Sequence, residues 1–127
     1  MDHSPGFLRL VDAVRATVRE ISVDEALARQ AAGARLVDVR EDGEWAAAHA
    51  AGAEHIGRGV LERDVERLVP DPDTELVLYC GGGYRSALAA DTLQRMGYRN
   101  VASVAGGWRA WEAAGAPVER PDPASGR

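Results

Sequence analysis

The only cysteine of the chain lies in a glycine-rich segment, Cys80-Gly81-Gly82-Gly83-Tyr84-Arg85, where we expect the chemistry. This segment follows the apolar run Leu76–Tyr79 and precedes a helix-like stretch that opens at Ser86. A thiol between a buried strand and a helix faces backbone N–H groups and the positive end of the helix macrodipole. Such surroundings favour the thiolate, which is the reactive form of cysteine. The alternative interpretation is a small buried apolar residue that precedes a turn.

The residues after the cysteine can hold a negative charge without a metal. If residues 81–85 curl around the sulfur, their N–H groups converge on it as a nest. Three successive glycines permit positive φ values and a close approach of backbone to ligand. Ser86 offers a hydroxyl donor as well.

Two covalent chemistries suit a cysteine nucleophile with an anion cradle. In sulfur transfer, the thiolate attacks a sulfane sulfur, becomes a persulfide and passes the outer sulfur to an acceptor. In phosphate-ester hydrolysis, a cysteinyl phosphate needs a larger cradle for three equatorial oxygens and a general acid for the leaving group. The short segment favours sulfur transfer.

Strand-like and helix-like segments alternate along the chain. Short, valine-rich apolar runs at 36–39, 76–79 and 101–104 are typical of buried parallel strands. Helix-like stretches follow them at 41–51, 85–96 and 107–114. This alternation predicts an α/β fold with a mainly parallel sheet covered on both faces. Ligands of such sheets bind beyond the carboxyl ends of the strands, and Cys80 follows one of those ends.

Other helices are predicted before and between these units. Ser4 and Pro5 resemble an N-cap and a first helical residue, and apolar residues then recur at helical spacing to Val18. Ser22 and Glu25 form a capping-box pattern that opens a helix from residue 23 to about residue 32. A further short helix is expected at 61–69, before a turn at 70–73.

Composition limits the class of protein. The 127 residues suit a single domain, and 46% apolar with 28% charged residues is an ordinary globular balance. The net charge of −5 has acidic and basic residues interspersed, which disfavours nucleic-acid and membrane partners. We expect a cytoplasmic protein, because the first residues lack the layout of a signal peptide and a lone thiol suits a reducing compartment.

Three motifs in order resemble the rhodanese-like domain family between about residues 20 and 119. They are the loop from Cys80 to Ala87, the segment Leu36-Val37-Asp38-Val39-Arg40 followed by Glu44-Trp45, and the closing segment Val104-Ala105-Gly106-Gly107-Trp108. The resemblance implies a five-stranded, mostly parallel sheet with helices on both faces. The loop has the length of the sulfurtransferase-type members, whereas the related phosphatase branch has one residue more.

The resemblance also implies roles for single residues. Cys80 would carry the persulfide, and the anion cradle would comprise Gly81, Gly82, Gly83, Tyr84, Arg85 and Ser86. Arg85 would lie at the rim and attract an anionic donor, or else form a salt bridge that fixes the loop. Asp38 and Arg40 would be structural charges near the site, while Gly106 and Gly107 would let the last strand turn beside the loop. Arg58 would line the pocket mouth, by resemblance to one bacterial group of single-domain members.

The chain departs from the family at two places. An isoleucine-proline pair is usual before Gly52, where this chain has His49-Ala50-Ala51, and extra positive charge is common in the loops of strong thiosulfate users. A persulfide of a small thiol or of a partner protein is therefore as good a donor as thiosulfate. His49 and His55 lack a third close ligand, so we expect His49 to cap or pack and expect no metal or organic cofactor.

The sequence thus predicts a single-domain sulfurtransferase that moves sulfane sulfur from thiosulfate or a low-molecular-weight persulfide to a thiol, cyanide or protein acceptor through Cys80. One alternative is a non-catalytic persulfide carrier or regulatory interaction module. Another is a cysteine-dependent phosphatase or arsenate reductase. We expect an N-terminal amphipathic helix at 1–19, the rhodanese-like domain at 20–119 and a flexible tail at 120–127.

Overall fold

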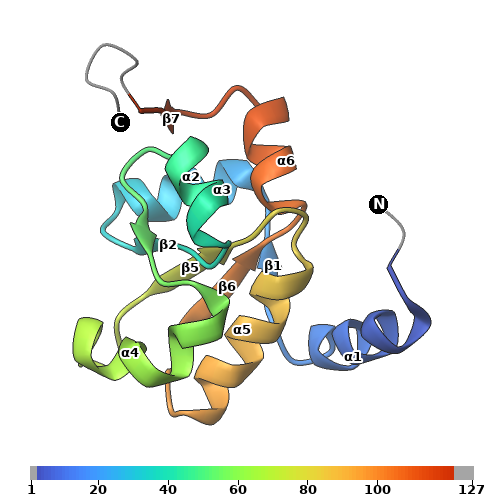
Figure 1. The fold of residues 1–127 in the computed structure, drawn as a ribbon. Coiled ribbons are helices and arrows are strands. Elements are labelled where there is room, and N and C mark those ends of the chain that lie inside the picture. The colour runs from blue at the N-terminus through green and yellow to red at the C-terminus, as the bar shows by residue number, and fades with distance from the viewer. Residues whose placement is uncertain (1–2, 122–127) are drawn as a thin grey trace.

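The computed structural model describes residues 3–121, an alternation of strands and helices (Figure 1). The elements in chain order are α1 (Pro5–Arg15), β1 (Arg19–Ile21), α2 (Val23–Ala31), β2 (Arg35–Asp38), α3 (Asp42–Ala47), β3 (His49–Ala50), β4 (Glu54–His55), the 3-10 helix η1 (Arg58–Val60), α4 (Leu61–Leu68), β5 (Leu76–Tyr79), α5 (Tyr84–Arg95), β6 (Val101–Val104), α6 (Gly107–Ala113) and β7 (Val118–Glu119). The predicted tail at 120–127 lies outside the described residues from position 122 onward.

Five strands form one sheet in the order β1-β6-β5-β2-β4. Every neighbouring pair in this sheet is parallel, which confirms the predicted five-stranded, mostly parallel α/β fold. The central strands β5 and β6 are buried along their whole length, as continuous apolar runs in a covered parallel sheet should be. A separate two-stranded antiparallel ribbon joins β3 to β7.

Helices cover both faces of the sheet (Figure 1). Side chains alternate between the faces along each strand, so Leu76 and Leu78 join one core, while Val77 and Tyr79 join the other. The first core includes residues of α4 and α5 and the end of α1, and the second includes residues of α2 and α6. This sandwich of helix, sheet and helix holds the carboxyl end of β5 rigidly between two packed layers.

The predicted helices at the N-terminal side form where their caps indicate. Helix α2 begins after Ser22, whose hydroxyl accepts a hydrogen bond of 3.1 Å from the backbone N–H of Glu25. Helix α1 begins at Pro5 as predicted, although the Ser4 side chain makes no capping hydrogen bond. Helix α4 covers most of the predicted 61–69 segment.

The predicted helix at 41–51 is wrong in its second half. Helix α3 ends at Ala47, and Ala48 is already extended. Partners from distant segments hold the following backbone groups, since Arg40 donates to the Ala48 carbonyl at 2.6 Å and the Tyr79 hydroxyl accepts from the Ala50 N–H at 3.0 Å. These tertiary contacts override the helical propensity of the alanine-rich segment.

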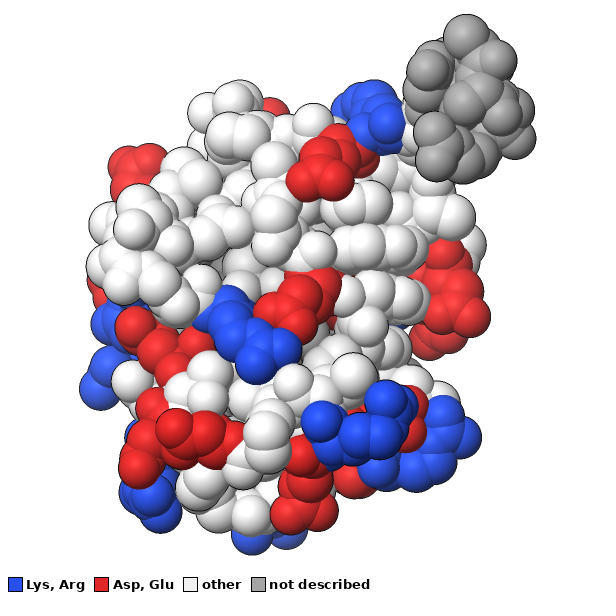
Figure 2. Space-filling model, turned by 90° about the vertical axis from the view of Figure 1, so that its left-hand side faces the viewer, with Lys and Arg blue, Asp and Glu red and all other residues white. Residues whose placement is uncertain are grey.

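Charged side chains of both signs are interspersed on the face shown in Figure 2. Many charged side chains of the described residues form ion pairs, as Arg35 does with Glu54 at 2.6 Å and Arg58 with Glu62 at 2.9 Å. None of the helices within residues 3–121 combines the length and the apolar character needed to cross a lipid bilayer.

Candidate active site

The glycine-rich segment connects the end of β5 to the start of α5, at the carboxyl edge of the parallel sheet. Cys80 directly follows the strand, and α5 begins at Tyr84. Gly83 is the N-cap of α5 with a φ of +96°, a conformation that L side chains adopt only under strain. A Cβ atom at this position would also lie 3.1 Å from the backbone nitrogen of Gly106. The short turn therefore depends on glycine at position 83.

Two donors contact the sulfur of Cys80. The backbone N–H of Gly83 donates to Sγ at 3.1 Å, and the Ser86 hydroxyl lies 3.5 Å from the same atom. The Ser86 hydroxyl also shares a 2.7 Å hydrogen bond with the buried Ser103 hydroxyl of β6. Because the sulfur faces the N-terminus of the twelve-residue α5, the macrodipole adds to these contacts. This arrangement can stabilise a negative charge on sulfur.

Helix α6 holds the other side of the loop. The backbone N–H groups of Trp108 and Arg109 donate to the carbonyls of Cys80 and Gly81, at 2.7 Å and 3.1 Å. Gly107, with a φ of +53°, lies so close that a Cβ atom there would overlap the Cys80 carbonyl oxygen. The structure thus places Gly107, and Gly106 before it, where the end of β6 turns beside the loop. These contacts fix the peptide groups that follow the cysteine.

Arg85 forms an ion pair across the pocket rim with Glu44 of α3. Its two terminal nitrogens lie 3.1 Å and 3.3 Å from the carboxylate oxygens. Burial opposes ionisation of Glu44, but the hydrogen bonds from Arg85 and from the Glu41 backbone N–H outweigh it, and the pKa of Glu44 lies below its usual value. Glu44 raises the pKa of Arg85 in turn. Of the two roles weighed for Arg85, the salt bridge is the one formed here.

Asp38 and Arg40 form a buried pair beneath the site. The Arg40 guanidinium donates to both Asp38 carboxylate oxygens at 2.8 to 3.1 Å and lies 4.5 Å from the Trp108 ring centroid. The Tyr79 hydroxyl donates to Asp38 at 2.6 Å. Burial and this hydrogen bond raise the pKa of Tyr79 far above its usual value, so it stays protonated. The network ties β2, β5 and α6 together, as expected for structural charges.

A pocket of about 540 Å³ opens onto Cys80. Four residues of the predicted cradle line it, namely Gly81, Gly82, Tyr84 and Arg85. Cys80 itself is only 1% exposed, so a reagent reaches the sulfur through this pocket.

Five further lining residues are not among the predicted site residues. They are His3, Phe7, Glu44, Trp108 and Arg109. Glu44 and Trp108 belong to the motifs that carry the family resemblance, so the sequence did indicate that these two residues could lie near the site. The structure does not bring Arg58 to this lining. Its guanidinium instead donates to Glu62 at 2.9 Å and to Thr92 of α5 at 3.3 Å.

The two histidines of the segment after α3 pack against an aromatic ring. His49 stacks on Trp45 with a distance of 3.4 Å between ring centroids, and the His55 ring stacks on the same residue at 5.0 Å. His49 also contacts the Trp45 carbonyl through Nδ1 at 3.0 Å, which confirms its predicted packing role. No group of three or more potential metal-ligating side chains comes together within the described part of the chain.

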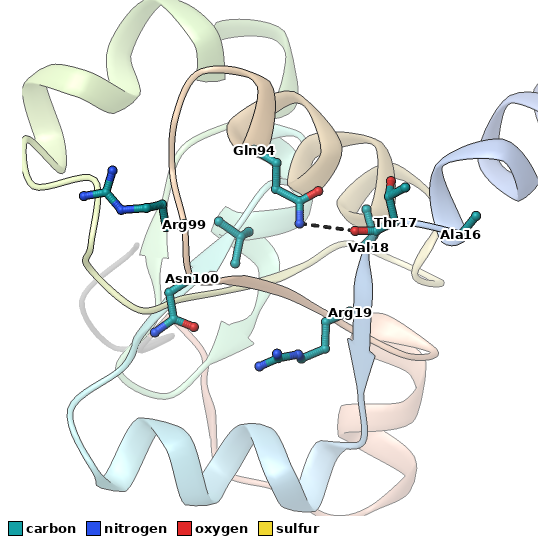
Figure 3. A pocket seen from close by; sticks show the side chains of 8 residues that line it. Ala16, Thr17, Val18, Arg19, Gln94, Arg99 and Asn100 are labelled. Carbon is teal, nitrogen blue, oxygen red and sulfur yellow. Dashed lines mark hydrogen bonds between the residues drawn. The ribbon is translucent and has the colours of Figure 1, made fainter.

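A second hollow, of about 450 Å³, lies at the opposite edge of the sheet (Figure 3). Its lining includes Thr17 and Arg19 at the entry to β1, Gln94 near the end of α5, and Arg99 just before β6. The Gln94 amide donates to the Thr17 carbonyl at 3.3 Å, as the dashed line shows. Arg99 is held by Asp73 at 2.6 Å. The sole thiol lies at the carboxyl end of the strands, so this hollow does not contain Cys80.

Comparison with known proteins identifies the sequence pattern. The family model described as "Rhodanese-like domain" matches residues 22–114. Thiosulfate sulfurtransferase GlpE of Pseudomonas entomophila is 36% identical over 93 residues, which cover 73% of this chain and 84% of that protein. A further relative, YrkF of Bacillus subtilis, is 31% identical over 99 residues. The match covers 78% of this chain but only 49% of that protein, so the chain spans about half its length.

Solved structures share the architecture. RPA3614 of Rhodopseudomonas palustris, described as a protein of unknown function and possible tyrosine phosphatase, matches with a TM-score of 0.79 and 32% identity, over 94% of this chain and 98% of that one. The polysulfide-sulfur transferase homodimer of Wolinella succinogenes matches with a TM-score of 0.77 and 28% identity, over 92% of this chain and 89% of that one.

Proposed function

This chain belongs to the rhodanese-like domain family, and from that premise we propose that it is a sulfurtransferase whose Cys80 carries sulfur as a persulfide. The observation that supports this most directly is the 3.1 Å hydrogen bond from the Gly83 N–H to the Cys80 sulfur. Relatives named thiosulfate sulfurtransferase and polysulfide-sulfur transferase support sulfur transfer as the reaction class. The donor is thiosulfate or a low-molecular-weight persulfide, and the acceptor is a thiol, cyanide or a partner protein.

In the first step, the Cys80 thiolate attacks the sulfane sulfur of the donor. With thiosulfate, the new S–S bond forms as the S–S bond of the donor breaks, and sulfite leaves with the bonding electron pair. The enzyme then holds a persulfide anion, so the reactants and products both carry three negative charges. The outer sulfur needs donors. We expect the amides of Gly81 to Ser86 and the Ser86 hydroxyl to supply them, because the Gly83 N–H and the Ser86 hydroxyl already contact the inner sulfur, Sγ.

In the second step, the acceptor attacks the outer sulfur of the persulfide. Cyanide takes that sulfur as thiocyanate, and the electron pair of the broken S–S bond returns to Cys80 as thiolate. The same two donors that contact Sγ then stabilise the leaving thiolate. The cycle balances in atoms and electrons and calls for no metal or organic cofactor, which fits a cytoplasmic protein with one reduced thiol.

The ionised Glu44 at the rim disfavours dianionic substrates such as phosphate esters. Phosphate recognition usually relies on an arginine that is free to form two parallel hydrogen bonds with the anion. Here the Arg85 guanidinium already makes such a pair with Glu44, and the carboxylate repels a phosphate dianion. Thiosulfate is a dianion as well, so the same repulsion acts on it, whereas a persulfide of a small thiol has at most one negative charge at its reacting sulfur.

Intact mass spectrometry after incubation with thiosulfate or an organic persulfide tests the proposal. We expect a gain of one sulfur atom that reductant removes, and steady-state thiocyanate formation when cyanide is added. Cys80→Ala should lose both signals. Ser4→Ala is the matched control, since the Ser4 side chain makes no capping hydrogen bond, and it should keep both.

Other outcomes identify the alternatives. A mass gain without turnover on any acceptor would point to a persulfide carrier or regulatory module. Hydrolysis of aryl phosphates or reduction of arsenate, with no mass gain from any sulfane donor, would overturn the proposal in favour of the second alternative.

A further inference from the structure

Helix α1 lies outside the region that matches the family model, yet it contributes to the pocket. It packs beside α5, and its residues Val11 and Val14 are buried. This packing brings Phe7 of α1, and His3 just before the helix, into the lining of the pocket that holds Cys80. Two residues from the start of the chain therefore line the route to the sulfur.

These residues form an aromatic wall with Tyr84, the first residue of α5. The ring centroids of His3 and Tyr84 lie 4.3 Å apart, those of His3 and Phe7 5.1 Å, and those of Phe7 and Tyr84 6.0 Å. Such distances are typical of favourable aromatic pairs. The Arg15 guanidinium lies over the Tyr84 ring, 5.0 Å from its centroid. The wall is thus held by contacts from both helices.

The size of the pocket exceeds what an inorganic donor requires. Its volume of about 540 Å³ falls within the range of roughly 300–1,000 Å³ that is typical of sites for drug-sized organic ligands. Trp108 and Arg109 of α6 also line the pocket. The site therefore offers aromatic surface, Arg109 as a cationic lining residue, and a rim where Glu44 offsets the charge of Arg85.

We infer that the wall of His3, Phe7 and Tyr84 selects organic persulfides with an apolar or aromatic group and a carboxylate over thiosulfate. This inference rests on the proposed function and names its donor class. The apolar group packs against the wall, and the carboxylate pairs with Arg109. The Cys80 thiolate attacks the outer sulfur of R–S–SH, the S–S bond of the donor breaks, and the thiolate R–S⁻ leaves as Cys80 becomes Cys–S–SH.

Substitution of Phe7 tests the wall. We compare kcat/KM for a carboxylated benzyl persulfide with that for thiosulfate, in wild-type protein and in Phe7→Ala. The ratio should fall about fivefold to tenfold, because one aromatic contact with the donor is lost. Leu10→Ala is the matched control, since Leu10 is on the same helix but 55% exposed, and it should keep the wild-type ratio. Phe7→Leu, which retains an apolar side chain, should have an intermediate ratio.

A second measurement needs no sulfur transfer. Cys80 is the only cysteine, so the rate constants for alkylation by N-benzyl iodoacetamide and by iodoacetamide report access to this one thiol. Phe7→Ala should lower their ratio, while Leu10→Ala should not. Equal ratios in all three proteins would overturn the inference. If Phe7→Ala lowers the alkylation ratio but no sulfane donor adds sulfur to the wild-type protein, the proposed function is wrong, while the role of the aromatic wall in controlling access to Cys80 is supported.

Discussion

Replacement of Gly107 by alanine should displace the loop that follows Cys80 and thereby lower both the stability of the protein and its turnover. A Cβ atom at this position overlaps the Cys80 carbonyl oxygen and lies 3.0 Å from the carbonyl carbons of Cys80 and Gly81. These are backbone atoms, so no flexible side chain can yield, and the loop must move on the order of 1 Å to restore ordinary contact distances. The movement acts on the peptide group that follows Cys80.

Two effects should lower the free energy of unfolding of Gly107→Ala. The φ of +53° is unfavourable for alanine by about 1–2 kcal/mol. The hydrogen bonds from the Trp108 and Arg109 N–H groups to the loop carbonyls weaken as the loop moves, at about 0.5–1.5 kcal/mol each. The free energy of unfolding should therefore fall by about 2–5 kcal/mol. Turnover should fall about 100-fold, the usual effect of a misplacement of roughly 1 Å at reacting groups.

Gly115→Ala is the control that separates these terms. Gly115 has a similar φ of +68°, but a Cβ atom there would meet no atom within 4 Å. This variant should lose only the conformational term, about 1–2 kcal/mol in urea unfolding, and keep its rate of thiocyanate formation. If Gly107→Ala matched Gly115→Ala in both stability and turnover, the contact between α6 and the loop would not position the cysteine, and the reasoning would fail.

Two further predictions concern buried polar pairs. Asp38→Asn should lower the free energy of unfolding by about 3–5 kcal/mol in urea titrations, because it leaves the Arg40 charge buried without its partner, and a second change of Arg40→Met should recover part of the loss. Ser86→Ala should slow sulfur transfer about fivefold through loss of roughly 1 kcal/mol at the Cys80 sulfur. Ser103→Ala should lower the free energy of unfolding by a similar amount, roughly 1 kcal/mol, but should slow sulfur transfer less, because the Ser86 donor remains. A lower rate of sulfur transfer in Ser103→Ala than in Ser86→Ala would contradict this order.

The central strands of the sheet could be predicted from the sequence because they are buried on both faces. The runs at 76–79 and 101–104 are apolar or small throughout, and the structure has β5 and β6 at those bounds. The edge strands β1 and β4 were not predicted. They have only three and two residues and are partly exposed, so they carry no apolar pattern. They become strands because the open edges of β6 and β2 supply their hydrogen-bond partners.

In the site, residues placed by local geometry could be predicted from the sequence, whereas residues placed by contacts between distant segments could not. The loop from Cys80 to Ser86 could be predicted because strand end, glycines and helix start are consecutive in the sequence, so local geometry brings the Gly83 N–H to the sulfur. The aromatic wall could not, because Phe7 reads only as one apolar position on an amphipathic helix. Its place beside Tyr84 follows from the packing of α1 on α5, which no local pattern specifies.

The way α6 holds the loop explains how a few backbone groups can serve as an anion site. In a planar trans peptide, the C=O of one residue and the N–H of the next point in opposite directions. Because the carbonyls of Cys80 and Gly81 are fixed toward the N–H groups of α6, the N–H groups of Gly81 and Gly82 must point away from that helix. The orientation of these donors is therefore set by the fold before any sulfur arrives, and electrostatic stabilisation of the proposed persulfide would require little reorganisation of the loop.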